Sequence, residues 1–213
     1  LLWFGWFGFN AGSALGDSFG NADGECVAAI AAMNTLIASA AACVSWMVTD
    51  KIATGKSTLV GACTGLVAGL VVITPAAGFV EAWAALIMGI VVSPICFFCV
   101  SKLKYKLGYD DALDAFGCHG IGGIVGGILT GIFCVPELSW TDYGGLLYTG
   151  DPSLLISQIL GIVITIVFVA IATAIIAFIV KACFGGSLAV KAADEGQGMD
   201  VAQHGESAYP AFD

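Results

Sequence analysis

Residues 110–133, which read DDALDAFGCHGIGGIVGGILTGIF, decide the fold class. Beyond Asp114 this stretch contains no Asp, Glu, Lys or Arg. Its glycines at positions 123, 127 and 131 recur every four residues and therefore share one helix face. Small residues at this spacing let helix backbones approach closely in a bilayer. The stretch predicts a tightly packed transmembrane helix.

The rest of the chain has the same character. Of its 213 residues, 59% are hydrophobic and 11% are charged, and the mean hydropathy is +0.96. This composition excludes an ordinary soluble domain. A helix needs roughly 20 apolar residues to span a bilayer, and six apolar runs reach or approach that length. The sequence predicts an all-α polytopic membrane protein over residues 1–183, with transmembrane helices at about 1–16, 26–49, 58–74, 83–100, 112–134 and 154–180.

Charge placement predicts the orientation of these helices. Every basic residue is a lysine that follows the second, fourth or sixth run: Lys51, Lys56, Lys102, Lys104, Lys106, Lys181 and Lys191. The alternate loops carry acidic residues instead: Asp17, Asp23, Glu25, Glu81, Glu137, Asp142 and Asp151. Because lysines are enriched in cytoplasmic loops, we expect both ends of this chain in the cytoplasm, with a polar cytoplasmic tail over residues 184–213. The outer surface is then acidic and favours cations.

His119 is the only histidine within a predicted span. Ionisable residues in spans are costly and are functional candidates. A neutral imidazole has one donor and one acceptor, so His119 is expected to line a route for a small polar molecule such as ammonia or water. The alternative is a histidine that serves only packing.

Two carboxylates precede His119 at the start of the same predicted helix. Asp111 and Asp114 are interpreted first as helix caps, because carboxylates stabilise free N–H groups and the dipole there. A proton-relay role for Asp114 is the alternative.

Another pattern lies in the first run. Leu2, Trp6, Phe9 and Ser13 are spaced as one helical stripe. Such a stripe usually indicates packing, but here it ends in a hydroxyl that can accept a hydrogen bond from a cation, beside the π face of Phe9.

Three phrases carry a resemblance to a known family: GWFGFNAGSALG (5–16), the stretch 110–133, and GMDVAQHGESAY (198–209). The segment TPAAGFVEAW (74–83) adds to them. Together they resemble the Amt/Mep/Rh ammonium transporters, and the Amt branch more than the Rh branch. Members have eleven helices and form trimers. The resemblance therefore implies that this chain holds the last six helices and the cytoplasmic tail, without the first five.

The resemblance also implies roles for particular residues. Ser13, Phe9 and Trp6 are expected at the substrate-binding site, with Ser13 in the outer recruitment site and Phe9 in the pore gate. His119 resembles the second of two pore histidines, and Leu2 a wall residue. Ammonium would be recruited outside and deprotonated, and ammonia would pass the histidines. His204 and Gly205 fall in the regulatory tail, where a cytoplasmic regulatory protein is a possible partner.

The implied protein is a homotrimer of the plasma membrane with no cofactor, no metal and no nucleic-acid partner. Three other hypotheses remain at this point. One is a Rh-type channel for ammonia or carbon dioxide. Another is an intramembrane enzyme built on His119 and the cysteines. The third is a membrane subunit without transport.

Overall fold

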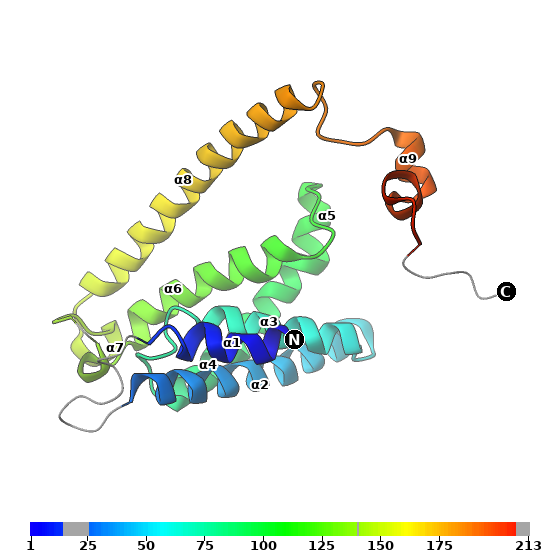
Figure 1. Ribbon diagram of the computed structural model, residues 1–213. Helices are drawn as coiled ribbons and strands as arrows, with labels where there is room; N and C mark the ends of the chain where they lie inside the picture. Colours follow the sequence, from blue (N-terminus) through cyan, green and yellow to red (C-terminus); the bar gives the residue numbers. More distant parts are fainter. Residues whose placement is uncertain (15–25, 140, 208–213) are drawn as a thin grey trace. The chain divides into compact units, whose positions relative to one another are not determined.

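The computed structural model describes residues 1–14, 26–139 and 141–207, and all regular structure in this part of the chain is helical (Figure 1). The predicted all-α fold is therefore confirmed for the described residues. The α-helices are α1 (Leu2–Ala11), α2 (Val27–Thr54), α3 (Leu59–Ile73), α4 (Ala82–Phe98), α5 (Lys104–Leu107), α6 (Ile121–Phe133), α7 (Leu146–Thr149), α8 (Ser153–Cys183) and α9 (Ala192–Gln197). Three π-helical turns (Cys99–Leu103, Phe116–Gly120 and Asp200–His204) and a 3-10 turn (Pro136–Leu138) complete the secondary structure.

Every predicted span contains a helix. Four continuous helices of the described chain are long and apolar enough to cross a membrane: Val27–Thr54, Ala82–Leu107, Phe116–Phe133 and Ser153–Cys183. α3 is apolar but shorter, and α1 is shorter still. That all six cross a bilayer stays a prediction.

Several helix boundaries differ from those expected. α1 ends at Ala11 and α2 continues to Thr54, and two further differences concern the fourth and fifth helices. The fourth helix continues through a π turn and α5 to Leu107, because lysine is a good helix former and does not interrupt it. It ends at Gly108, whose φ of +69° suits glycine. The fifth helix begins only at Phe116, because Asp114 has a left-handed backbone conformation, with φ +56°, that no α-helix contains.

The chain divides into two compact units, Leu1–Ile162 and Val163–Asp213. The first contains α1 to α7 and the start of α8. The second contains the rest of α8, α9 and the π turn Asp200–His204. Within the second unit, Gln203 Nε2 donates a hydrogen bond to Asp194 Oδ2 at 3.1 Å. His204 closes the π turn, and Gly205 follows it with φ +69°.

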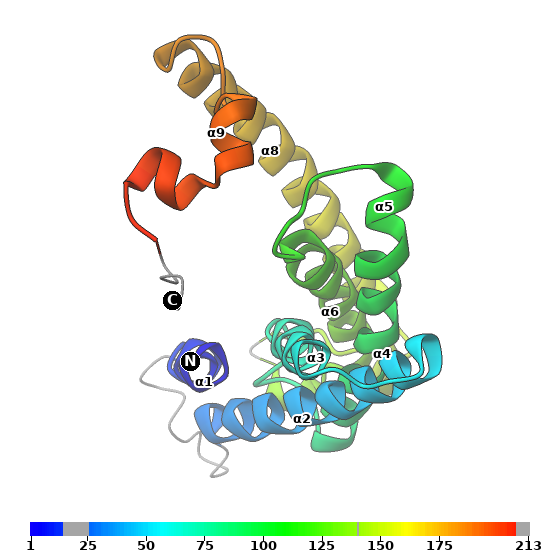
Figure 2. The same ribbon diagram turned by 90° about the vertical axis from the view of Figure 1, so that its right-hand side faces the viewer.

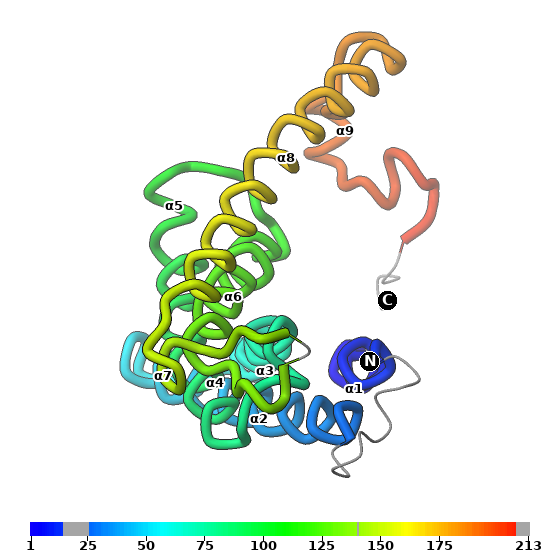
Figure 3. Tube along the Cα trace, turned by 90° about the vertical axis from the view of Figure 1, so that its left-hand side faces the viewer, coloured from blue at the N-terminus to red at the C-terminus, as the bar shows by residue number. Residues whose placement is uncertain are grey.

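α2 is the centre of packing in the first unit. It contacts α1, α3 and α4, and α3 also contacts α6. Figure 2 views α1 almost end-on, with α3 beside it and α2 running beneath both. Figure 3 traces the chain from α6 through α7 into α8.

Glycines make these contacts close. A Cβ on Gly69 of α3 would lie 2.5 Å from the carbonyl oxygen of Ala38 on α2, and a Cβ on Gly89 of α4 would meet the same oxygen. Ala38 is fully buried between them. Gly69 and Gly89 are therefore packing residues, whereas a Cβ on Gly8 in α1 would have no atom within 4 Å.

A buried carboxylate joins α2 to α3. Asp50 is 6% exposed, and its Oδ2 accepts hydrogen bonds from the backbone N–H and the hydroxyl of Thr58, each at 2.9 Å. Thr58 in turn caps α3 by accepting from the N–H of Gly61. Asp50 thus fixes the residue at which α3 begins.

We expect Asp50→Ala to destabilise the protein by about 1–2 kcal/mol, because both donors of Thr58 would lose their partner. The measurement is the thermal midpoint of the detergent-solubilised protein. Lys51→Ala is the matched control, since Lys51 is the exposed neighbour of Asp50. Equal midpoints for the two variants would contradict the capping role.

Candidate functional site

Three side-chain hydrogen bonds fix the orientation of α1. Trp3 Nε1 donates to Ser39 Oγ at 3.0 Å, and Asn10 Nδ2 donates to Thr35 Oγ1 at 3.0 Å; both acceptors are on α2. A third bond runs from Trp6 to Thr74, the residue that follows α3. Because these donors lie along the length of α1, the helix is prevented from rotating about its axis.

Trp6 links the residues that the sequence analysis selected. Its Nε1 donates to Thr74 Oγ1 at 2.9 Å, and its ring lies 5.2 Å from Phe9 and 6.1 Å from His119, measured between ring centroids. The fold therefore brings the α1 stripe and His119 together. The sequence placed Trp6 and Phe9 on one stripe and indicated His119 separately, but no local pattern indicated the contact with His119 or the role of Thr74.

Ser13 and Phe9 line a cavity of about 260 Å³ at the end of α1. Asn10 and Thr74 also line it. The hydroxyl of Ser13 donates to the carbonyl oxygen of Phe9, which leaves lone pairs on Oγ that can accept from a cation. Leu2 begins the stripe and is 60% exposed in this chain.

His119 lies in the π turn Phe116–Gly120 that leads into α6. Single π turns inside helices are frequent at functional sites. His119 is exposed in this chain, whereas the adjacent Cys118 is buried. The turn thus directs the imidazole away from the core and towards Trp6.

The two carboxylates before His119 have different partners. Asp111 accepts hydrogen bonds from the backbone N–H groups of three residues at 2.8, 3.0 and 3.3 Å, which is the geometry of a helix cap: Ala115, Phe116 and Gly117. Asp114 instead forms an ion pair of 2.5 Å with Lys104. No sequence pattern indicated this partner, because Lys104 was interpreted only as a signal of membrane topology.

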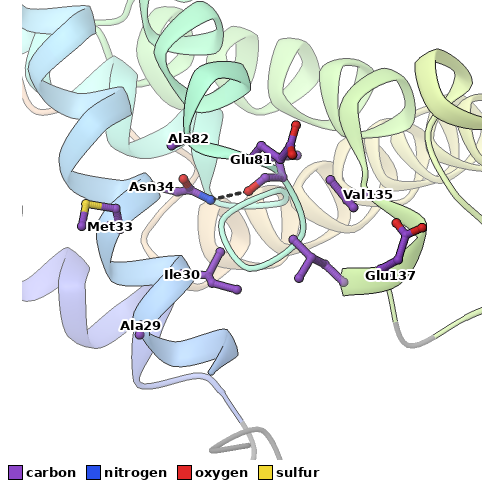
Figure 4. Close-up of a pocket in the computed structure, with 10 residues that line it drawn as sticks. Ala29, Ile30, Met33, Asn34, Glu81, Ala82, Val135 and Glu137 are labelled. Carbon is purple, nitrogen blue, oxygen red and sulfur yellow. Dashed lines mark hydrogen bonds between the residues drawn. The ribbon is translucent and has the colours of Figure 1, made fainter. Parts of the chain in front are cut away.

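Acidic residues also line a separate cavity of about 490 Å³, shown in Figure 4. Asn34 donates to the carbonyl oxygens of Ala77 and Val80 at 2.8 and 2.7 Å and thereby holds the loop before α4. Glu81 and Glu137 lie at this cavity.

Glu81 is held in its charged form. Its carboxylate accepts hydrogen bonds from Trp83 Nε1 and Tyr148 Oη, and these bonds lower the pKa of Glu81. Burial and the hydrogen bond to Glu81 raise the pKa of Tyr148 to about 12. Glu81 is therefore an anion at neutral pH. Of the other acidic residues in the alternate loops, Asp17, Asp23 and Glu25 lie outside the described residues.

Comparisons with known proteins show which family the chain resembles. The family model described as Ammonium Transporter Family matches residues 1–209. A putative ammonium transporter of Methanothermobacter thermautotrophicus is 47% identical over 209 residues, covering 98% of this chain and 49% of the relative. An ammonium transporter of Bacillus subtilis is 48% identical, again covering 98% of this chain and 49% of the relative.

Solved structures also resemble this chain. The crystal structure of Candida albicans Mep2 superposes with a TM-score of 0.78 at 34% identity, covering 91% of this chain and 42% of that protein. The chain spans about half the length of the curated relatives that it matches.

Proposed function

The chain belongs to the ammonium transporter family, and we propose from this premise that the protein moves ammonium or ammonia across a membrane. It is a multi-pass membrane protein whose relatives are transporters and not enzymes. The observation that carries the proposal is the position of Trp6, which lies against both Phe9 and His119. One row of side chains thus joins Ser13, whose hydroxyl can accept a hydrogen bond from a cation, to the imidazole of His119.

The proposed mechanism begins at the cavity that Ser13 and Phe9 line, which we place on the outer side of the membrane. Ammonium donates a hydrogen bond to Ser13 Oγ, while the π faces of Phe9 and Trp6 stabilise its charge. A bare ion has a large desolvation penalty in an apolar passage, so the ion transfers a proton to water on the outer side before it proceeds as ammonia. Neutral ammonia then passes His119, whose imidazole replaces the hydrogen bonds that water would supply.

Several finer features belong to the same proposal. The lysine pattern supports six membrane spans, with residues 184–213 in the cytoplasm of a plasma-membrane protein. We also propose a homotrimer and a regulatory role for the tail around His204 and Gly205. One structural relative, similar over 95% of this chain at 25% identity and a TM-score of 0.78, is named Sensor Amt Protein, which favours a regulatory partner.

The alternative hypotheses lose support. The named relatives are ammonium transporters and Mep2 proteins, so a Rh-type channel is not favoured. An intramembrane enzyme has no support among these relatives. A growth experiment distinguishes a membrane subunit without transport from a transporter.

The direct test of transport is growth. The complete natural reading frame that contains this chain is expressed in cells that lack ammonium transporters, with limiting ammonium as the nitrogen source. Growth restored relative to empty vector supports transport. Failure to restore growth, with the protein present in the membrane, would favour the non-transporting subunit.

Substitution of Ser13 tests the recruitment step. We expect Ser13→Ala to raise the KM for methylammonium uptake by about three- to tenfold, because the cation loses one hydrogen-bond acceptor worth about 1 kcal/mol. Ser57→Ala is the control, since Ser57 is an exposed loop serine that donates to the carbonyl of Met47. An unchanged KM for Ser13→Ala would remove Ser13 from the binding site.

A further inference from the structure

The backbone around His119 departs from an ordinary helix at two neighbouring places. The π turn Phe116–Gly120 carries the imidazole, and Asp114, just before it, has φ +56°. Asp114 is the only described residue other than glycine with a positive φ. Such a conformation is unfavourable for a residue with a Cβ and persists where the surroundings impose it. Something must therefore hold Asp114 in place.

Lys104 provides that restraint. Its Nζ lies 2.5 Å from Asp114 Oδ1 and donates to the carbonyl oxygen of Asp111 at 3.2 Å. One ammonium group thus binds both ends of the short segment that reverses the chain. The Asp114 carbonyl then accepts the N–H of Cys118 at 2.9 Å, which connects the restrained residue directly to the turn that contains His119.

The placement of Lys104 suits this role. Its side chain is 14% exposed, and that of Asp114 is 30% exposed. Lys104 begins α5, the last turn of the long fourth helix, so its position is set by a rigid element. Side-chain packing supports the same segment, since the ring of Tyr109 meets that of Phe116 edge-on at 5.7 Å.

We propose that Lys104 and Asp114 are positioning residues, which fix the register of the π turn and so hold the His119 imidazole against Trp6. This inference rests on the proposed transport function. It assigns Lys104 a role beyond topology and replaces a proton relay through Asp114. A single ion pair that is still partly exposed to solvent contributes little to overall stability. The effect of breaking it is therefore expected in the transport rate and not in the amount of folded protein.

The test measures methylammonium uptake per transporter molecule in the complete natural reading frame. Lys104→Met removes the charge and keeps the length of the side chain. Lys106→Met is the matched control, because Lys106 lies on the same short helix and makes no ion pair within the described residues. We expect Lys104→Met to lower Vmax by about fivefold or more, because small displacements of a pathway group are costly, with the KM unchanged. Lys104→Arg should retain most of the rate.

A second pair of variants separates the effect of the Asp114 carboxylate from the effect of the backbone conformation at this residue. Asp114→Gly removes the carboxylate but tolerates the positive φ, whereas Asp114→Ala removes the carboxylate and keeps the strain. We expect Asp114→Gly to transport faster than Asp114→Ala, and Lys104→Met to have no further effect on Vmax in the Asp114→Gly background.

Two results overturn the inference. One is a Vmax per molecule for Lys104→Met equal to that of Lys106→Met. The other is a loss for Lys104→Met that persists undiminished in the Asp114→Gly background. Absence of uptake by the unsubstituted protein is a different failure, because it overturns the proposed function itself.

Discussion

Replacing His119 with alanine is expected to lower the Vmax of methylammonium uptake about tenfold or more, which corresponds to about 1.4 kcal/mol in the barrier. The amount of protein in the membrane should stay the same, because His119 is exposed in this chain and forms no part of its buried core. In an apolar passage, ammonia has few hydrogen-bonding partners. Alanine would remove the donor and the acceptor that the imidazole supplies.

Cys118→Ala is the matched control for this prediction. Cys118 occupies the same π turn and is buried, so its substitution changes a neighbouring side chain of the turn and leaves the imidazole in place. We expect Cys118→Ala to retain most of the uptake rate. If His119→Ala transported as well as Cys118→Ala, His119 would not belong to the pathway, and the packing hypothesis for this residue would hold.

The second large effect, a loss of thermal stability, is expected on substitution of Gly126, where α6 meets α3. A Cβ there would lie 2.5 Å from the carbonyl oxygen of Val72 and 3.1 Å from Pro75 Cγ. Because a backbone oxygen cannot move aside as a flexible side chain can, Gly126→Ala must separate the helices. Overpacking of this kind costs about 1–3 kcal/mol, and the thermal midpoint in detergent should fall by several degrees.

Gly123→Ala provides the comparison on the same helix. No atom of this chain lies within 4 Å of a Cβ built at Gly123, so we expect a midpoint close to that of the unsubstituted protein. Since α3 leads to Thr74, which holds Trp6, Gly126→Ala should also reduce uptake per molecule. Equal midpoints for the two variants would contradict the close approach of α3 and α6.

The helical fold was predictable because the signals that specify it are local. Long apolar runs and glycines at four-residue spacing reflect the needs of helices in a bilayer, and each run contains a helix. The helix ends near Leu107 and Phe116 were less predictable. They depend on whether lysines continue a helix and on the backbone conformation of Asp114, and neither is set by hydropathy.

The candidate site was predictable only in part, for a related reason. The spacing of Trp6, Phe9 and Ser13 predicted one helix face, whereas α1 ends at Ala11 and Ser13 lies in the turn after it. The rarity of charge in the spans draws attention to His119. The contacts that join them are long-range. Trp6 meets Thr74 and His119 across distances in sequence that no periodicity describes.

The most direct test of the account is the uptake of labelled methylammonium into cells that lack ammonium transporters. The complete natural reading frame is compared with empty vector, with His119→Ala and with Cys118→Ala at matched protein levels. The account predicts uptake that excess ammonium inhibits, present with the unsubstituted protein and with Cys118→Ala but reduced about tenfold or more with His119→Ala. Uptake equal to that of empty vector, from a protein present in the membrane, would contradict it.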